Sequence, residues 1–182
     1  MKSTPKSLFR GLALGCLLLM HPPAARATQA ARGHDRPWVT GEVAYDTQNP
    51  FARIIRGELP AYKVYEDGQV LAFLSKDQSQ PGHVLVISRT SRAQNIMEMS
   101  PQDLTRVMLV AQRIARAEVR SLHADGVEIR QNNGAAANQT VFHLHVHVIP
   151  RWDDAPPEFA RNANGTLDRP ALAARIAAAI RD

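Results

Sequence analysis

The feature that most constrains this chain is the run His143-Leu144-His145-Val146-His147, in which histidine alternates with aliphatic residues. Alternation with a period of two is typical of a β-strand, because successive side chains of a strand point to opposite faces. We therefore predict a strand over residues 140–149, ended by Pro150, with three imidazoles on one face. The aliphatic residues on the other face are expected to join the hydrophobic core.

The spacing of the three histidines bears on whether they bind a metal ion. At about 3.3 Å per residue, the backbones of the outer two lie roughly 13 Å apart, too far for all three rings to reach one ion. A site using two of them with His83 or a carboxylate stays open. A merely polar strand face is disfavoured, because three of the chain's seven histidines fall within five residues.

A cluster of imidazoles suits the chemistry of phosphate groups. Histidine titrates near neutral pH, so each ring can be a nucleophile, a hydrogen-bond donor or an acceptor, depending on its protonation. One neutral imidazole can attack phosphorus while its neighbours donate hydrogen bonds to the phosphate oxygens and the leaving group. The pattern thus favours phosphoryl chemistry without a metal ion or a cofactor.

Residues 1–27 have the organisation of a secretory signal peptide. Lys2, Lys6 and Arg10 precede an apolar run over residues 11–20, and Ala25-Arg26-Ala27 fits a cleavage site. The apolar run is about half as long as a membrane-spanning helix requires, so we expect no membrane anchor after cleavage. The mature protein is expected to be periplasmic or secreted.

Removal of this segment changes the charge and the cysteine content. It contains four of the 22 Lys and Arg residues and no acidic residue, which leaves 18 basic against 17 acidic residues. With no basic stripe interleaved with aromatic residues, we expect no nucleic acid partner. Cys16 is the only cysteine, so the mature chain is expected to have no disulfide, and lipid attachment at Cys16 is a less favoured alternative.

The remaining sequence predicts an alternation of short strands and helices. Residues 28–48 lack periodicity and are expected to be a linker or arm, and a short helix follows between the capping residue Asn49 and Gly57. A long helix is predicted after Ser100-Pro101, where apolar residues recur at helical spacing from Leu104 through Met108. The predicted strands are residues 63–66, 70–74, 84–87, 127–131 and 140–149, and a final helix is predicted over residues 170–180.

The segment from Phe142 to Arg151 resembles the signature of the histidine triad (HIT) superfamily, in particular its Hint-like branch. Other segments resemble the family in the right order, so the resemblance covers residues 49–151, followed by a C-terminal extension with a helix, residues 152–182. It implies an α+β, HIT-like fold in which an antiparallel sheet of about five strands is covered by the long helix, with a short N-terminal helix. A homodimer is also implied.

The resemblance implies a role for each histidine. His145 is similar to the nucleophile that attacks the α-phosphate of a nucleotide conjugate and forms a nucleotidyl-histidine intermediate, which water hydrolyses. His143 resembles the residue that orients and polarises this nucleophile. His147 and His83 resemble residues that contact the phosphate or the leaving group.

The implied substrate is a purine nucleotide conjugate, either a phosphoramidate or a dinucleoside polyphosphate. Residues similar to those that contact its sugar, phosphate or base are Asn132, Gln139, Thr140, Phe51, Ile54 and Phe73. Taken alone, the three apolar residues read as core, Asn132 as a turn residue and Thr140 as a strand residue. Their order relative to the histidines favours the substrate-binding interpretation.

The chain departs from the family pattern at Ser75 and Lys76, where close relatives have an aspartate, which accepts hydrogen bonds from the ribose, and an aliphatic residue. Serine lacks the paired acceptor oxygens that a diol favours, and lysine makes a poor wall for a purine. We therefore expect Ser75 to contact the ribose with altered selectivity. Two alternative functions stay open: a nucleotide-binding module with little turnover, and a periplasmic metal-binding protein.

Overall fold

The computed structural model describes residues 43–78, 80–156, 159 and 167–181. The predicted signal peptide and residues 28–42 lie outside the described residues. Within these residues, none of the helices combines the length and apolar character needed to span a bilayer.

The short helix α2, Pro50–Ile55, begins where the sequence predicts. The side-chain oxygen of Asn49 accepts hydrogen bonds from the backbone N–H groups of Phe51 and Ala52, both at 3.0 Å. These bonds satisfy two of the donors that a helix start leaves unpaired. Gly57 follows the helix with a φ of 76°, the left-handed conformation that glycine adopts without steric cost.

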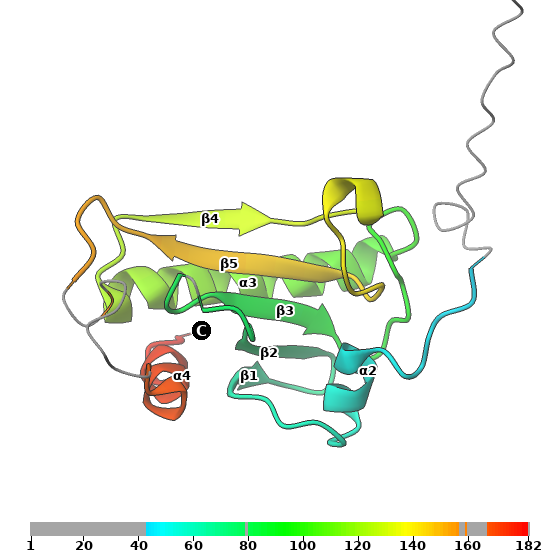
Figure 1. Ribbon diagram of the computed structural model, residues 1–182, viewed down its shortest axis with the longest axis horizontal. Coiled ribbons are helices and arrows are strands. Elements are labelled where there is room, and N and C mark those ends of the chain that lie inside the picture. The colour runs from blue at the N-terminus through cyan, green and yellow to red at the C-terminus, as the bar shows by residue number, and fades with distance from the viewer. Residues whose placement is uncertain (1–42, 79, 157–158, 160–166, 182) are drawn as a thin grey trace, which may run out of the picture. The chain divides into compact units, whose positions relative to one another are not determined.

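Five strands form one antiparallel sheet in the order β1-β2-β3-β5-β4, as Figure 1 shows, which confirms the predicted sheet. Their bounds are β1 Lys63–Glu66, β2 Val70–Leu74, β3 Val84–Ser88, β4 Gly126–Arg130 and β5 His145–Arg151. Strands β1 and β2 are joined by a turn in which Asp67 Oδ1 accepts hydrogen bonds from the N–H groups of Gln69 and Val70. Strand β4 lies at one edge of the sheet.

The long helix α3, Pro101–Leu122, covers one face of the sheet (Figure 1). Ser100 caps its start by accepting a hydrogen bond from the N–H of Asp103 at 3.1 Å. The core between helix and sheet contains Val84, Val86, Val146, Val148, Val107, Ala111 and Ile114, each fully buried. Met108, which the spacing placed on the buried stripe, is 41% exposed, so that part of the prediction is wrong.

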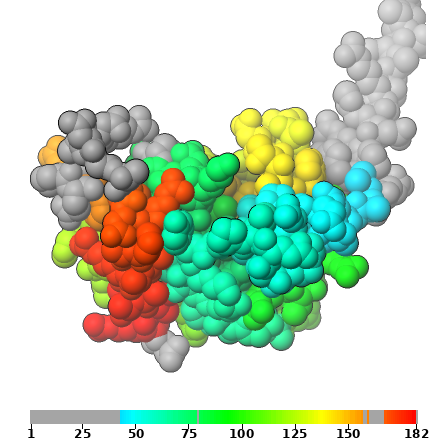
Figure 2. All heavy atoms as spheres, turned by 60° about the horizontal axis from the view of Figure 1, so that its bottom comes forward, coloured from blue at the N-terminus to red at the C-terminus, as the bar shows by residue number. Residues whose placement is uncertain are grey.

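The last helix, α4, Arg169–Ala178, packs against α3 and β1 and confirms the predicted C-terminal helix. Asp168 caps its start by accepting a hydrogen bond from the N–H of Ala171 at 2.9 Å. Figure 2 shows α4 and α2 at opposite ends of the surface formed around the β1–β2 hairpin. Residues Leu172 and Ile176 of α4 are buried in the core.

Strand β5 differs at both ends from the predicted strand of residues 140–149. It begins only at His145, because the N–H of Leu144 donates to the carbonyl oxygen of Ala93 at 2.9 Å instead of to a neighbouring strand. It continues through Pro150 to Arg151, and Pro150 pairs with Val127 of β4. Proline is tolerated there because β3 pairs with β5 only as far as Val148, so Pro150 has one strand neighbour.

Candidate active site

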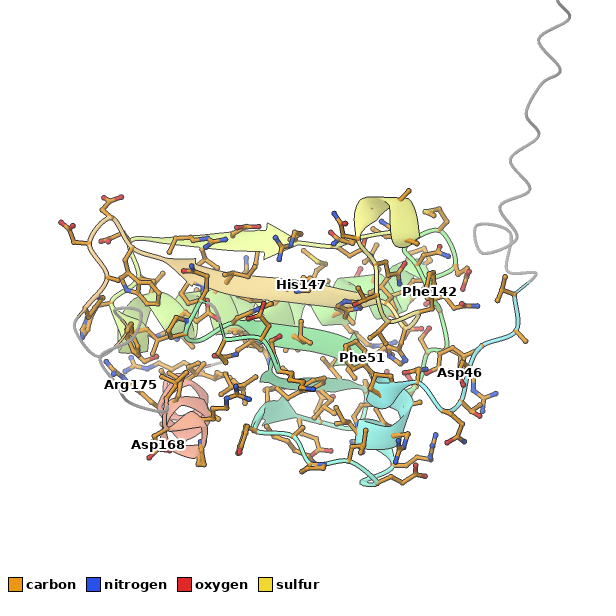
Figure 3. All side chains as sticks on the ribbon, viewed as in Figure 1. Asp46, Phe51, Phe142, His147, Asp168 and Arg175 are labelled. Atoms are coloured by element: carbon orange, nitrogen blue, oxygen red, sulfur yellow. The ribbon has the colours of Figure 1, made fainter. Side chains whose placement is uncertain are left out.

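The histidines lie on the sheet face opposite α3. Val146 and Val148 alternate with His145 and His147 along β5 and are fully buried in the core beneath α3, which leaves the histidines on the other side. Figure 3 shows His147 of β5 and Phe51 of α2 in front of the sheet, with α3 behind it. The predicted division into an imidazole face and an aliphatic face is confirmed for the residues in β5.

The ring of His145 is held by its own backbone environment. Its Nδ1 lies 2.8 Å from the carbonyl oxygen of His143, an acceptor, so Nδ1 carries the proton and donates it. In the neutral ring, Nε2 then bears the lone pair. Burial lowers the pKa of His145, and its side chain is only 5% exposed, so the neutral form prevails at neutral pH.

His143 precedes β5 and is fixed at both ring nitrogens. Its Nε2 lies 3.0 Å from the carbonyl oxygen of Ser88, to which it donates, and its Nδ1 accepts a hydrogen bond from the hydroxyl of Tyr45 at 2.6 Å. Burial lowers the pKa of His143 to about 4, so the ring is neutral at neutral pH. The backbone carbonyl of His143 thus fixes the orientation of the His145 ring, while the side chain of His143 anchors that peptide.

Tyr45 is the site residue that sequence reasoning missed, because it lies in the stretch expected to be a linker or arm. Residues 43–48 instead attach to the domain, where Gln94 Nε2 donates to the carbonyl oxygen of Val43 at 2.6 Å. Within residues 43–48, the only signal in the sequence is the spacing of Val43 and Tyr45, an apolar and an aromatic residue separated by one position.

His147 and His83 form a hydrogen-bonded pair. Nε2 of His83 lies 2.8 Å from Nδ1 of His147, and Nδ1 of His83 lies 3.2 Å from the carbonyl oxygen of Asp77, to which it donates. In the neutral pair, His147 therefore donates from Nδ1 and keeps the lone pair on Nε2. Burial, then the neighbouring His145, lowers the pKa of His147 to about 3, and burial also lowers the pKa of His83.

Glycine at position 82 allows this pair to form. Gly82 has a φ of 89°, and an added Cβ would lie 2.6 Å from a side-chain carbon of Leu122 and 3.0 Å from one of Pro150. A larger residue would therefore strain the backbone at this φ and force the side chain of Leu122 or Pro150 to shift, directly before His83.

The residues predicted to wall the base pocket lie beside the histidines. The ring of Phe51 packs edge-on against His145, with centroids 5.0 Å apart, and against Phe73, with centroids 5.6 Å apart. Ile54 packs against the same apolar cluster, which also includes Leu71. The structure thus brings all three apolar residues together beside His145.

The polar residues predicted to contact substrate differ in their exposure. Gln139 is buried, and its amide bonds three backbone groups, those of Gly134, Gln94 and Val141, so it shapes the loop before β5. Asn132 is half-buried, with Nδ2 3.4 Å from the carbonyl oxygen of Asn138, and Thr140 is exposed.

Ser75 follows β2 and is 8% exposed, and its hydroxyl accepts a hydrogen bond from the N–H of Asp77 at 3.2 Å. Its backbone N–H donates to the carbonyl oxygen of His83 at 2.8 Å, which ties it to the histidine pair.

Among the residues that the structure describes, no three of His, Cys, Asp and Glu are grouped so that they could hold a metal ion.

Comparison with known proteins places this geometry in a family. The model of the HIT domain matches residues 56–154. An adenylylsulfatase of Arabidopsis thaliana is 31% identical over 149 residues, covering 78% of this chain and 75% of that protein. A HIT-like protein of Bartonella henselae involved in cell-cycle regulation superimposes with a TM-score of 0.65 at 38% identity, covering 75% of this chain and 99% of that one.

A protein of Sulfolobus tokodaii described as a hypothetical histidine triad nucleotide-binding protein gives a TM-score of 0.65 at 33% identity, over 71% of this chain and 90% of that one. These likenesses agree with the HIT-like fold that the sequence resemblance implied. The matched segment includes His83, the three histidines of residues 143–147 and all five strands of the sheet. The chain belongs to the HIT domain family.

Proposed function

We propose that this protein is a nucleotidyl hydrolase or transferase that cleaves nucleotide conjugates at the α-phosphate through a nucleotidyl-His145 intermediate. The observation that carries the proposal is the 2.8 Å hydrogen bond from Nδ1 of His145 to the carbonyl oxygen of His143. It directs the lone pair of a neutral imidazole to Nε2, the form a histidine nucleophile requires. The match to an adenylylsulfatase and to a nucleotide-binding protein supports it.

In the first step, Nε2 of His145 forms a bond to phosphorus as the bond to the leaving group breaks. The leaving group takes a proton from protonated His147, whose ring lies next to that of His145, with centroids 4.9 Å apart. Burial disfavours that proton, and a bound phosphate anion opposes this effect by stabilising the imidazolium. In the second step, water attacks phosphorus, gives its proton to neutral His147 and releases His145.

The substrate class we propose is a purine nucleotide conjugate. Phe51, Phe73 and Ile54 offer an apolar surface beside His145, suited to the face and edge of a base. Ser75 offers the ribose one hydroxyl that already accepts a backbone hydrogen bond from Asp77. We therefore expect weaker discrimination between ribose and deoxyribose than a carboxylate would give.

The proposal is tested by assaying a panel of adenosine phosphoramidates, dinucleoside polyphosphates and adenylyl sulfate with a chelator present. We expect turnover of at least one conjugate, unaffected by the chelator, and loss of more than about a thousandfold in His145→Asn. His123→Asn is the matched control, because His123 is exposed, lies at the end of α3 and has a φ of 54° that asparagine tolerates. Full activity in His145→Asn would contradict the proposal, and activity lost to the chelator would favour a metal-binding protein.

We also propose a homodimer, with the edge strand β4 and one flank of α3 as its interface. Ile129 of β4 is 43% exposed on the α3 side of the sheet, and Met108 and Val119 of α3 are 41% and 47% exposed. Met108 and Val119 lie on one side of the helix, about three turns apart. Light scattering after gel filtration should show a dimer that Met108→Glu converts to a monomer, whereas Leu109→Glu, on another side of α3, should remain dimeric.

Export is proposed from residues 1–27 alone. Expression of the full chain in a Gram-negative host, followed by fractionation and intact-mass measurement, should find a processed protein in the periplasm. An unprocessed protein in the cytoplasm would contradict a cleaved signal.

A further inference from the structure

We propose that Arg130 and Arg151 form a subsite for an anionic leaving group beside His147, so that the enzyme favours nucleotide conjugates whose leaving group is a sulfate or phosphate over those that release a neutral amine. This inference rests on the proposed function and names the substrate class within it. Neither arginine takes part in the proposed chemistry of the histidines.

The sheet register places both arginines on the histidine face. Arg130 of β4 is the direct cross-strand partner of His147 of β5. Directly opposite residues of antiparallel strands project to the same face, with Cβ atoms about 5 Å apart. Arg151 lies four residues beyond His147 on β5, so the strand period of two puts it on that face as well.

A shared carboxylate confirms that the two arginines lie on one face. Arg151 donates to Glu128 Oε2 from Nη2 and, at 3.2 Å, from Nε. Nη1 of Arg130 lies 3.4 Å from the other oxygen of Glu128. Two guanidinium groups thus share one carboxylate, which leaves a net positive charge next to the pair of His147 and His83.

Both guanidinium groups can be reached by a ligand. The side chains of Arg130 and Arg151 are 47% and 43% exposed, and Glu128 holds each of them near the histidines. The positive charge of Arg130 is one of the causes, after burial and neighbouring histidines, that lower the pKa of His147. The charge of Arg130 therefore acts at His147, the ring that protonates the leaving group in the proposed function, and the charge of Arg151 acts on His83, the hydrogen-bond partner of His147.

An anionic leaving group gains negative charge as its bond to phosphorus breaks. Guanidinium groups placed where that charge develops stabilise the transition state more than the ground state, and they bind sulfate and phosphate oxygens in a planar, two-pronged geometry. An amine leaving group develops no such charge once it is protonated. The arginines should therefore act on one class of leaving group and not on the other.

The test compares two substrates with the same adenylyl group: adenylyl sulfate and adenosine 5′-phosphoramidate. We expect Arg130→Gln to lower the ratio of kcat/KM for the sulfate to that for the phosphoramidate by about tenfold, with Arg130→Glu lowering it further. Glu128→Gln should shift the ratio the other way, because it removes the competing carboxylate. Arg106→Gln is the matched control: it removes a similarly exposed arginine of α3 that is ion-paired with Asp103 at 3.0 Å.

An unchanged ratio in Arg130→Gln and Arg130→Glu, with turnover of both substrates intact, would overturn the subsite and leave the proposed function standing. A second measurement does not depend on turnover: titration of the full protein with inorganic phosphate, followed by NMR of the arginine Nε–H groups. We expect saturable shifts of the Nε–H signals of Arg130 and Arg151, and we expect the shift at Arg151 to weaken in Arg130→Gln. Absence of such shifts would overturn the subsite, whereas shifts without turnover of any conjugate would overturn the enzyme function alone.

Discussion

The hydroxyl oxygen of Tyr45 lies 2.6 Å from Nδ1 of His143, and this hydrogen bond connects the segment before α2 to the residue whose carbonyl oxygen holds the ring of His145. Because Tyr45 donates to Nδ1, the proton of neutral His143 stays on Nε2, which donates to Ser88. The peptide carbonyl of His143 is thereby held where it accepts from His145. In the proposed mechanism Tyr45 is a positioning residue, because it reaches His145 only through His143.

Tyr45→Phe tests this relationship, because it removes the hydroxyl and keeps the ring. We expect kcat to fall about three- to tenfold with little change in KM, and the free energy of unfolding to fall by about 1 kcal/mol, since the buried Nδ1 loses its donor. Tyr62→Phe, at a 44% exposed tyrosine, is the control. The ¹⁵N shifts of His143 separate a positioning role from a structural one: an unchanged tautomer and kcat in Tyr45→Phe would contradict the account.

The alternation of residues 143–147 sufficed to predict an imidazole face and a buried aliphatic face, because a period of two follows from backbone geometry alone. Local signals also located α2 and α3, since Asn49 and Ser100 cap the helices that follow them in sequence. Tyr45 could not be found this way. Its partner His143 is 98 residues away, and the spacing of Val43 and Tyr45 does not indicate which residue Tyr45 contacts.

The start of β5 was missed for a similar reason. The sequence alternation extends before His145, but the N–H of Leu144 donates to Ala93, in a loop whose position depends on the whole fold. Gln139 was expected to contact substrate, and its burial depends in part on the carbonyl oxygen of Gln94, 45 residues away, whereas Gly134 and Val141 are its neighbours in sequence. The local sequence pattern predicts the helices and strands well. Long-range hydrogen bonds decide where these helices and strands end and which polar side chains are buried.

The pKa of His143 predicts an acid-dependent stability. A histidine whose pKa is lowered from 6.5 to about 4 on folding binds more protons in the unfolded chain, so its contribution is complete above pH 6.5 and is lost as the pH falls toward 4. Urea unfolding at pH 7.5 and pH 4 should show that the wild type loses about 3 kcal/mol more than His143→Gln. Equal losses in both proteins would show that His143 is not held neutral by burial.

Glu118 of α3 predicts the opposite trend at higher pH. Its side chain is fully buried, neither carboxylate oxygen has a hydrogen-bond partner in the described part of the chain, and burial raises its pKa to about 9. The contribution of Glu118 to the free energy of unfolding is therefore complete below pH 4.5, where the carboxyl is neutral in both states, and is lost as the pH rises toward 9. The advantage of Glu118→Gln over the wild type in the free energy of unfolding should grow by roughly 4 kcal/mol from pH 5 to pH 8, while Glu66→Gln, at an exposed ion pair, should show no such growth.

Ser75 predicts how the sugar is selected. In Ser75→Asp, one carboxylate oxygen can keep the hydrogen bond from the N–H of Asp77, and the other becomes available to the ribose hydroxyls. We expect the preference for adenosine over 2′-deoxyadenosine conjugates, measured as a ratio of kcat/KM, to increase about tenfold. If ribo and deoxy substrates react equally in both proteins, Ser75 does not lie at the sugar.

The central claim is a covalent bond between the nucleotide and His145, and rapid-quench intact-mass measurement with peptide mapping tests it most directly. During turnover of an adenylyl conjugate in the presence of a chelator, we predict the added mass of one adenylyl group on His145, formed equally in His123→Asn and not formed in His145→Asn. Efficient turnover without an adduct, or an adduct on a residue other than His145, would contradict the account.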